Sequence, residues 1–355
     1  MKSKYQVAVI GATGMAGQQF MEALINHPWF EIFSIHGHSS VGSKFGNSIR
    51  GFTNFEYSED IKQMKVQDTK DLDLKAIDIV FSAIPSSQAK KIEGEIAKEV
   101  PVISTASAYR YEEDVPIYLP IVNGEHYKML DVQKRNREWN GFVLPGPNCT
   151  TVGLSISLYP IYQKYGIESV HMTSMQAISG AGYPGVAAYD IVANVIPHIK
   201  GEEEKVVKET KKILGTVEET RFIPAQFTID CKCNRVPSIN GHMESVFVQT
   251  KREFESIQEI KEVFKNFKGQ TSNLDLPNAP KVPIQIFEDP YRPQPRIDLS
   301  ERKNTKQGMR TFIGGIASTN FPNGFKYTVL SHNTQLGAGR GGVLSAEYLI
   351  AKDYI

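Results

Sequence analysis

The first half of the chain alternates short apolar runs with amphipathic segments. Five runs rich in Val, Ile and Phe are typical of buried strands: 5–10, 30–36, 77–84, 101–104 and 142–144. After the first of them, Phe20, Met21, Leu24 and Ile25 recur at helical spacing until a His-Pro pair ends the segment. Strands that alternate with helices in this way predict a doubly wound, mostly parallel sheet.

From about residue 150 the pattern changes. A helix-like stretch at 150–165 leads into longer segments in which apolar and polar residues alternate: 169–178, 222–236, 244–250, 309–317 and 325–330. Helical patterns at 202–214 and 256–267 interrupt them. Such alternation favours a mostly antiparallel sheet with one covered face. Residues 277–295 carry six prolines and are expected to form an extended arm or a subunit contact.

Composition narrows the class of protein. Forty Lys plus Arg against 39 Asp plus Glu leave a net charge of +1, without the basic excess of a nucleic-acid or membrane-surface binder. No apolar run approaches the roughly 18 residues of a membrane span, and the N-terminus has no signal-peptide pattern. Three cysteines make no disulfide framework. We expect a cytoplasmic enzyme or binding protein with no nucleic-acid partner.

The segment 11–17 (GATGMAG) follows the first strand and opens a helix. Glycines at such a turn let backbone N–H groups approach a pyrophosphate at the positive end of the helix. A tight turn without a ligand is the alternative, but strand, turn and helix are all in place. We expect a dinucleotide to contact Gly11, Thr13, Gly14, Met15, Ala16 and Gly17.

The end of the second strand bears on which dinucleotide binds. An NAD site usually has an acid there for the ribose 2′-OH, whereas this chain reads HGHSSVGSK from residue 36. Ser39, Ser40 and Lys44 would suit a 2′-phosphate, which favours NADP. The alternative is that the two serines only begin a polar loop.

Two domains follow from these patterns and from a length of 355 residues. We predict an α/β chain with an N-terminal Rossmann-like domain at 1–148. Residues 149–332 are expected to form an α+β catalytic domain with a mostly antiparallel sheet. The C-terminal segment 333–355, with a helical run at 343–351, is expected to return to the first domain.

Cys149 is the most informative single residue. It lies in GPNCTTVG, where a polar turn meets a helix, and the positive helix end would lower the pKa of its thiol. A lone cysteine is more often structural, and that interpretation fits Cys231 and Cys233 in their alternating strand. C-x-C without a second pair or a histidine cluster is poor support for a metal site, so none is predicted.

Further polar segments offer a proton partner and substrate anchors for a thiolate. Gln176 begins the loop QAISGAGYPG after a strand, and Arg235 and His242 flank a proline turn. Glu202 and Lys205 are three residues apart and share a helix face. Each alone could be a turn or a solvated charge, and spacing does not single out one of the eight histidines.

Together these segments resemble the aspartate-semialdehyde dehydrogenase family in its archaeal and fungal form. The resemblance covers nearly the whole chain. The motifs GATGMAG, SAIPSS, ASAYR, GPNCTTVGL, MQAISGAGYPG, GEEEK, CNRVP, RPQPR and HNT occur in the family's order. GPNCTT and MQAISGAGYPG are highly specific.

The resemblance implies NADPH-dependent reduction of L-4-aspartyl phosphate to L-aspartate 4-semialdehyde, towards lysine, methionine and threonine. Cys149 is similar to the nucleophile that forms a thioester, and His242 to the acid/base group. Gln176 matches the residue that orients the acyl group. Arg235 matches the anchor of the substrate carboxylate, and Glu202 the partner of its ammonium.

The resemblance also implies the remaining contacts and the assembly. The phosphate pocket would consist of Asn148, Arg110, Lys205 and Ser107. Further cofactor contacts would be Ser82, Ser179, Gly180, Gly182 and Asn333. The family is expected to assemble as a homodimer or homotetramer through the second domain.

Some features depart from the family. Its 2′-phosphate loop often has an Arg between serines, which is absent here, and Arg340 in the glycine-rich turn after Asn333 could face cofactor phosphates or solvent. Malonyl-CoA reductase of the same superfamily is the alternative function, although it needs no phosphate or ammonium partner. N-acetyl-glutamyl-phosphate reductase is more distant. A non-catalytic dinucleotide-binding regulator would not need Cys149 or His242.

Overall fold

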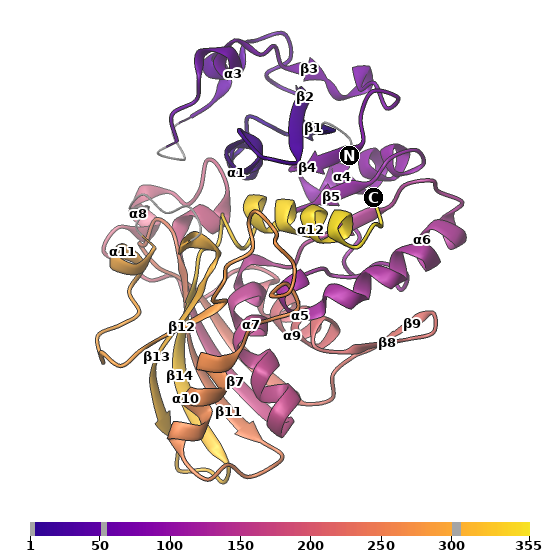
Figure 1. The fold of residues 1–355 in the computed structure, drawn as a ribbon. Helices are drawn as coiled ribbons and strands as arrows, with labels where there is room; N and C mark the ends of the chain where they lie inside the picture. Colours follow the sequence, from indigo (N-terminus) through magenta and orange to yellow (C-terminus); the bar gives the residue numbers. More distant parts are fainter. Residues whose placement is uncertain (1–3, 51–54, 300–306) are drawn as a thin grey trace. The chain divides into compact units, whose positions relative to one another are not determined.

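The computed structural model describes residues 4–50, 55–299 and 307–355 (Figure 1). The chain divides into two compact units, each with its own sheet. The first comprises Met1–Tyr118, Glu125–Gly146 and Ala338–Ile355. The second comprises Leu119–Gly124 and Pro147–Gly337.

The sheet of the first unit has six strands in the order β3-β2-β1-β4-β5-β6. Every neighbouring pair is parallel. The strands are β1 (Tyr5–Ile10), β2 (Phe30–Gly37), β3 (Gln67–Asp68), β4 (Ile79–Ser82), β5 (Val102–Ser104) and β6 (Val143–Pro145). The chain runs outward from β1 in one direction and then continues from β4 in the other, so β1 and β4 flank the switch point at which such sheets bind ligands. The predicted doubly wound sheet is confirmed.

Helices cover this sheet on both faces. They are α1 (Met15–Leu24), α2 (Phe45–Ser48), α3 (Glu59–Gln63), α4 (Ser86–Ala97), α6 (Met129–Arg137) and α12 (Gly339–Ala351), with the 3₁₀ turn η1 (Thr69–Asp71). The α12 helix packs so closely on α1 that a side chain at Gly339 would collide with the backbone of Gln19. Arg340 Nη2 lies 3.3 Å from Glu22 Oε1, so this arginine pairs within its own unit.

The sheet of the second unit has the order β10-β7-β11-β14-β13-β12. The three inner pairings are antiparallel and the two edge pairings are parallel. Its strands are β7 (Ile167–Gln176), β10 (Thr228–Arg235), β11 (His242–Thr250), β12 (Ile284–Phe287), β13 (Thr311–Ser318) and β14 (Gly324–Ser331). The predicted α+β unit with a mostly antiparallel sheet is confirmed.

The helix α7 (Cys149–Tyr165) packs on one face of this sheet beside α10 (Ile257–Asn266). The helix α9 (Glu202–Ile213) contacts both α7 and β10. Shorter helical elements of this unit are α5 (Pro120–Asn123), η3 (Ile178–Ala181), α8 (Ala188–Ile191), α11 (Pro295–Asp298) and η4 (Gln307–Met309), and η2 (Gly124–Lys128) lies almost wholly in the first unit. These contacts bring the start of α7 and the start of α9 to the same end of the sheet.

Two expected elements differ from the structure. The predicted strand 222–236 is broken at Pro224, which has no N–H for a ladder. Its first part is β9 (Arg221–Ile223), which forms a separate hairpin with β8 (Thr216–Glu218). The proline-rich stretch 277–295 is not an isolated arm, because it contains β12, which pairs with β13 at the edge of the second sheet, where prolines are tolerated.

In the described part of the chain, no helix is both long enough and apolar enough to cross a membrane.

Candidate active site

Strand register aligns three of the candidate side chains in one row across the second sheet. Arg235 at the end of β10 pairs with Gln176 at the end of β7. On the other side of β7, Met175 pairs with Met243, so Gln176 and His242 are the next neighbours. Arg235, Gln176 and His242 are all buried. Residues 66 positions apart in the sequence thus meet at one end of the sheet.

Cys149 is the first residue of α7 and faces this row. The side chain of Asn148 caps the helix, with Oδ1 accepting from Thr150 N at 2.9 Å and Thr151 N at 3.4 Å. The Cys149 Sγ atom lies 3.2 Å from His242 Nε2. The thiol and the imidazole are therefore in direct contact, as a nucleophile and its proton partner require.

His242 is held in one orientation and one protonation state. Its Nδ1 atom accepts a hydrogen bond from Ala177 N at 3.1 Å, so the neutral ring carries its proton on Nε2 and directs it at the sulfur. Burial, aided by the positive charge of Arg235 and by His332, lowers the pKa of His242 to about 3. The ring is neutral at ordinary pH.

Ala177 also fixes Arg235. The Arg235 Nη1 atom donates to Ala177 O at 2.7 Å, while burial lowers the pKa of the guanidinium, which stays cationic. Gly180 lies against both side chains. A Cβ at Gly180 would be 2.9 Å from Arg235 Nη1 and 3.1 Å from His242 Nε2. A side chain at Gly180 would therefore displace Arg235 and His242.

The α9 helix brings two buried carboxylates to Asn148, the residue before Cys149. Glu202 Oε1 accepts from Asn148 Nδ2 at 3.0 Å, and Glu202 Oε2 lies 3.5 Å from Lys205 Nζ. Glu209 Oε2 accepts from Asn148 N at 2.6 Å. Sequence reasoning missed Glu209, although its position seven residues after Glu202 places it on the same helical face.

The segment after β14 contacts both Cys149 and the loops around His242. Asn333 Oδ1 accepts from Gly241 N, and its Nδ2 donates to Ser179 Oγ, both at 2.8 Å. A Cβ at Gly337 would be 2.9 Å from the Cβ of Cys149, so this turn needs a small residue. Gly182 has a positive φ of 70°, a conformation that glycine adopts readily.

Three candidates belong to the first unit. Arg110 is buried and donates from Nε to Gly146 O at 2.8 Å. The hydroxyls of Ser107 and Ser86 lie 3.0 Å apart. Ser82 is fully buried at the end of β4 and donates to Glu93 Oε1 at 2.6 Å, so its hydroxyl is used inside the unit.

The glycine turn of the first unit suits a pyrophosphate. Gly11 has a positive φ of 76°, and a Cβ at Gly17 would be only 2.0 Å from Gly11 O. Gly14 caps α1, whose first turn holds no acidic residue. No side-chain hydrogen bond caps this positive end of the helix, which suits an anion.

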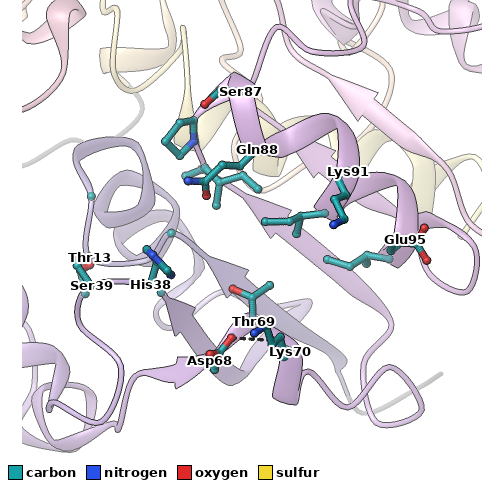
Figure 2. Close-up of a pocket in the computed structure, with 18 residues that line it drawn as sticks. Thr13, His38, Ser39, Asp68, Thr69, Lys70, Ser87, Gln88, Lys91 and Glu95 are labelled. Atoms are coloured by element: carbon teal, nitrogen blue, oxygen red, sulfur yellow. Dashed lines mark hydrogen bonds between the residues drawn. The ribbon is translucent and has the colours of Figure 1, made fainter.

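A cleft of about 930 Å³ adjoins this turn (Figure 2). Thr13, Ser39 and His38 line one side, and Ser87, Gln88, Lys91 and Glu95 of α4 line the other. Asp68, Thr69 and Lys70 complete it. Its size and its position at the switch point fit a dinucleotide.

Residues at the cleft differ in part from the expected ones. Ser40 Oγ lies 3.2 Å from Thr13 Oγ1, whereas Lys44 is exposed and does not line the cleft. Asp68 and Lys70 escaped sequence reasoning because β3, which carries the first of them, is only two residues long. Across the described ranges, no group of three His, Cys, Asp or Glu side chains could hold a metal ion.

Two family models match the chain. Residues 6–130 match the semialdehyde dehydrogenase NAD binding domain, and residues 158–336 match the semialdehyde dehydrogenase dimerisation domain. The second unit thus contains a domain associated with oligomer formation.

Relatives match over the whole length. The aspartate-semialdehyde dehydrogenase of Archaeoglobus fulgidus is 42% identical, with 99% of this chain and 100% of the relative covered. The malonyl CoA reductase (NADP) of Metallosphaera sedula is 35% identical, with 100% and 99% covered. The solved structure of Candida albicans aspartate semialdehyde dehydrogenase with NADP superposes with a TM-score of 0.89 at 35% identity, covering 99% of this chain and 100% of that one.

Proposed function

This chain belongs to the aspartate-semialdehyde dehydrogenase family, and we propose that it reduces L-4-aspartyl phosphate to L-aspartate 4-semialdehyde and phosphate with NADPH. This is the reaction that leads towards lysine, methionine and threonine. The contact of 3.2 Å between Cys149 Sγ and His242 Nε2, beside the buried Arg235, is the observation that carries the proposal.

Cys149 is the proposed nucleophile. Its sulfur forms a bond to the acyl carbon, the carbon–oxygen bond to phosphate breaks, and phosphate leaves with the electron pair. NADPH bound at the glycine turn would supply the hydride that reduces the resulting thioester. The carbon–sulfur bond then breaks, its electrons return to the sulfur, and the aldehyde is released.

His242 would serve this sequence through its Nε2–H. Because Ala177 occupies Nδ1 and burial keeps the ring neutral, the Nε2–H can donate to the thiolate before attack. After attack it can donate to the oxyanion that forms on the carbon bound to the sulfur. Gln176, its neighbour in the row, would orient the acyl oxygen.

The remaining charges match the substrate. Arg235 would bind the α-carboxylate with the donors that Ala177 leaves open. Glu202 would pair with the ammonium through Oε2, the oxygen that faces Lys205. Arg110, Lys205, Asn148 and Ser107 would hold the phosphate group.

The proposed cofactor is NADP, held by the glycine turn 11–17 in the 930 Å³ cleft. Ser39 and Ser40, with Lys70 near the end of β3, would contact the 2′-phosphate. Asn333, Ser179, Gly180 and Gly182 would lie at the nicotinamide end. In the proposal the protein is cytoplasmic and assembles as a homodimer or homotetramer through its dimerisation domain.

Malonyl-CoA reduction is the second candidate, since a reductase of that kind is 35% identical over the full length. A CoA thioester could use the same Cys149 and Arg235. It carries neither an ammonium for Glu202 nor a phosphoryl leaving group for Lys205. These two side chains, both at the start of α9, favour aspartyl phosphate.

Reverse turnover tests the proposal. The protein receives L-aspartate 4-semialdehyde and phosphate with NADP or NAD, and reduced nicotinamide is followed by absorbance. We expect phosphate-dependent reduction of NADP. Activity with NAD alone would retain the reaction and overturn the cofactor assignment. If the protein oxidises no L-aspartate 4-semialdehyde with either cofactor but reduces malonyl-CoA in the forward direction, then malonyl-CoA replaces aspartyl phosphate as the proposed substrate.

A Cys149→Ala variant separates an enzyme from a non-catalytic dinucleotide-binding protein. We expect turnover to vanish while NADPH binding, followed by quenching of protein fluorescence, stays unchanged. Turnover equal to that of the parent protein would refute the nucleophile assignment.

A further inference from the structure

We propose that Glu209 is a positioning residue that sets the location of the Cys149 sulfur by holding the backbone of Asn148. The proposal rests on the function above only in taking Cys149 as the nucleophile. Glu209 lies on α9 and is 0% exposed. Its Oε2 atom accepts from Asn148 N at 2.6 Å.

Asn148 is held from several directions at once. Glu209 binds its backbone N–H, and Glu202 Oε1 binds its side-chain Nδ2 at 3.0 Å. Its Oδ1 accepts the first N–H groups of α7. Because Cys149 is the next residue, any displacement of Asn148 moves the sulfur relative to His242 Nε2, 3.2 Å away.

The two carboxylates of α9 divide this task. They are seven residues apart and therefore lie on one face of the helix. Glu202 binds the side chain of Asn148 and also lies near Lys205 at the start of α9, whereas Glu209 binds the backbone N–H of Asn148. A hydrogen bond to a carboxylate is short and strong, and its loss would leave the Asn148 N–H buried without this acceptor.

Two variants of matched size test the proposal. Glu209→Gln keeps an acceptor oxygen that is weaker than a carboxylate oxygen, and Glu209→Met keeps the side-chain volume without an acceptor. We expect Glu209→Gln to reduce kcat about threefold to tenfold and Glu209→Met about a hundredfold, with the KM values within about twofold of the parent. Glu204→Gln, exposed on the same helix, should behave as the parent protein.

Alkylation of Cys149 by iodoacetamide gives a readout that needs neither substrate nor cofactor. We expect the alkylation rate to be lower in Glu209→Gln than in the parent protein and lowest in Glu209→Met, because the sulfur no longer keeps its contact with His242. A failure of the proposed substrate would leave this measurement intact. Equal alkylation and kcat in Glu209→Gln and the parent protein would overturn the proposal, including when the Met variant does not fold.

Discussion

The backbone N–H of Ala177 donates to Nδ1 of His242 at 3.1 Å, and this contact determines which ring nitrogen faces the sulfur of Cys149. The Ala177 carbonyl simultaneously accepts from Arg235 Nη1 at 2.7 Å. One residue after β7, Ala177, thus orients both the proposed proton donor and the proposed carboxylate anchor through its backbone. The proton of the neutral imidazole is left on Nε2, directed at Cys149.

This arrangement predicts that His242 does not titrate in the ordinary pH range. Because burial lowers its pKa to about 3, the ring stays neutral from about pH 5 to 9. Nitrogen-15 NMR of the labelled protein should show that the ring of His242 is protonated on Nε2 and that its nitrogen chemical shifts are constant over that range. A titration midpoint near neutral pH for the His242 ring would contradict the assignment.

His242→Ala should reduce kcat by about a hundredfold to ten-thousandfold with NADPH affinity unchanged.

Gly180→Ala is expected to impair turnover without unfolding the protein. The added methyl group would lie 2.9 Å from Arg235 Nη1 and 3.0 Å from His242 Cε1, so both side chains must shift. We expect kcat/KM to fall about tenfold to a hundredfold, since small misplacements in a catalytic site are costly. The melting temperature should change little. Ala181→Ser, in the same turn but exposed, is the matched control, and equal activity of the two variants would show that the methyl group is accommodated.

Glu93 is expected to make the stability of the first unit pH-dependent. Its Oε1 accepts from Ser82 and Ser104, both at 2.6 Å, and burial raises the pKa of the carboxyl from 4.5 to about 7. A raised pKa contributes stability that is complete below pH 4.5 and is lost as the pH rises through 7. The loss amounts to roughly 3 kcal/mol.

Thermal melts of Glu93→Gln test this expectation, because glutamine does not ionise. The melting temperature of the variant, relative to the parent protein, should increase as the pH is raised from about 5 to 8. Glu95→Gln, exposed on the same helix, should show no such trend. Parallel pH profiles for Glu93→Gln and the parent protein would refute the assigned direction.

Ser39→Asp should shift the cofactor preference. Ser39 lines the cleft just beyond the end of β2, where a carboxylate repels a 2′-phosphate and accepts from a 2′-OH. We expect the ratio of kcat/KM for NADPH to that for NADH to fall by at least about tenfold. Ser43→Asp, exposed in the same loop and outside the lining of the cleft, should leave the ratio unchanged. An unchanged ratio in Ser39→Asp would place the 2′-phosphate elsewhere.

Most of the fold could be predicted from local patterns. The parallel sheet of the first unit follows from short apolar runs separated by helical periodicity, and the glycine segment 11–17 occurs where its backbone has the required turn. Two elements with few apolar residues are not predicted by these patterns. They are β3, which consists of Gln67 and Asp68, and α6, in which most residues are polar. Alternation of apolar and polar residues predicts one strand through Pro224, because this pattern takes no account of the N–H that proline lacks.

The family resemblance, confirmed by full-length relatives, rests on motifs that are contiguous in the sequence. Glu209 lies outside these motifs, and Ala177, although it lies within MQAISGAGYPG, has no polar side chain to single it out. Glu209 is one charged residue among many on a polar helix, and Ala177 acts through its backbone alone. Neither contact follows from the residue type alone.

By itself, then, the sequence determined the two sheets, the dinucleotide turn and the chemical types of Cys149, His242 and Arg235. Local periodicity and motif spacing carry that information. Only the tertiary structure decided that β7, β10 and β11 lie side by side in the register that aligns the site, because strand pairing joins residues far apart in the chain. The pKa of His242 was likewise decided there, since it depends on burial and on neighbours that no sequence window contains.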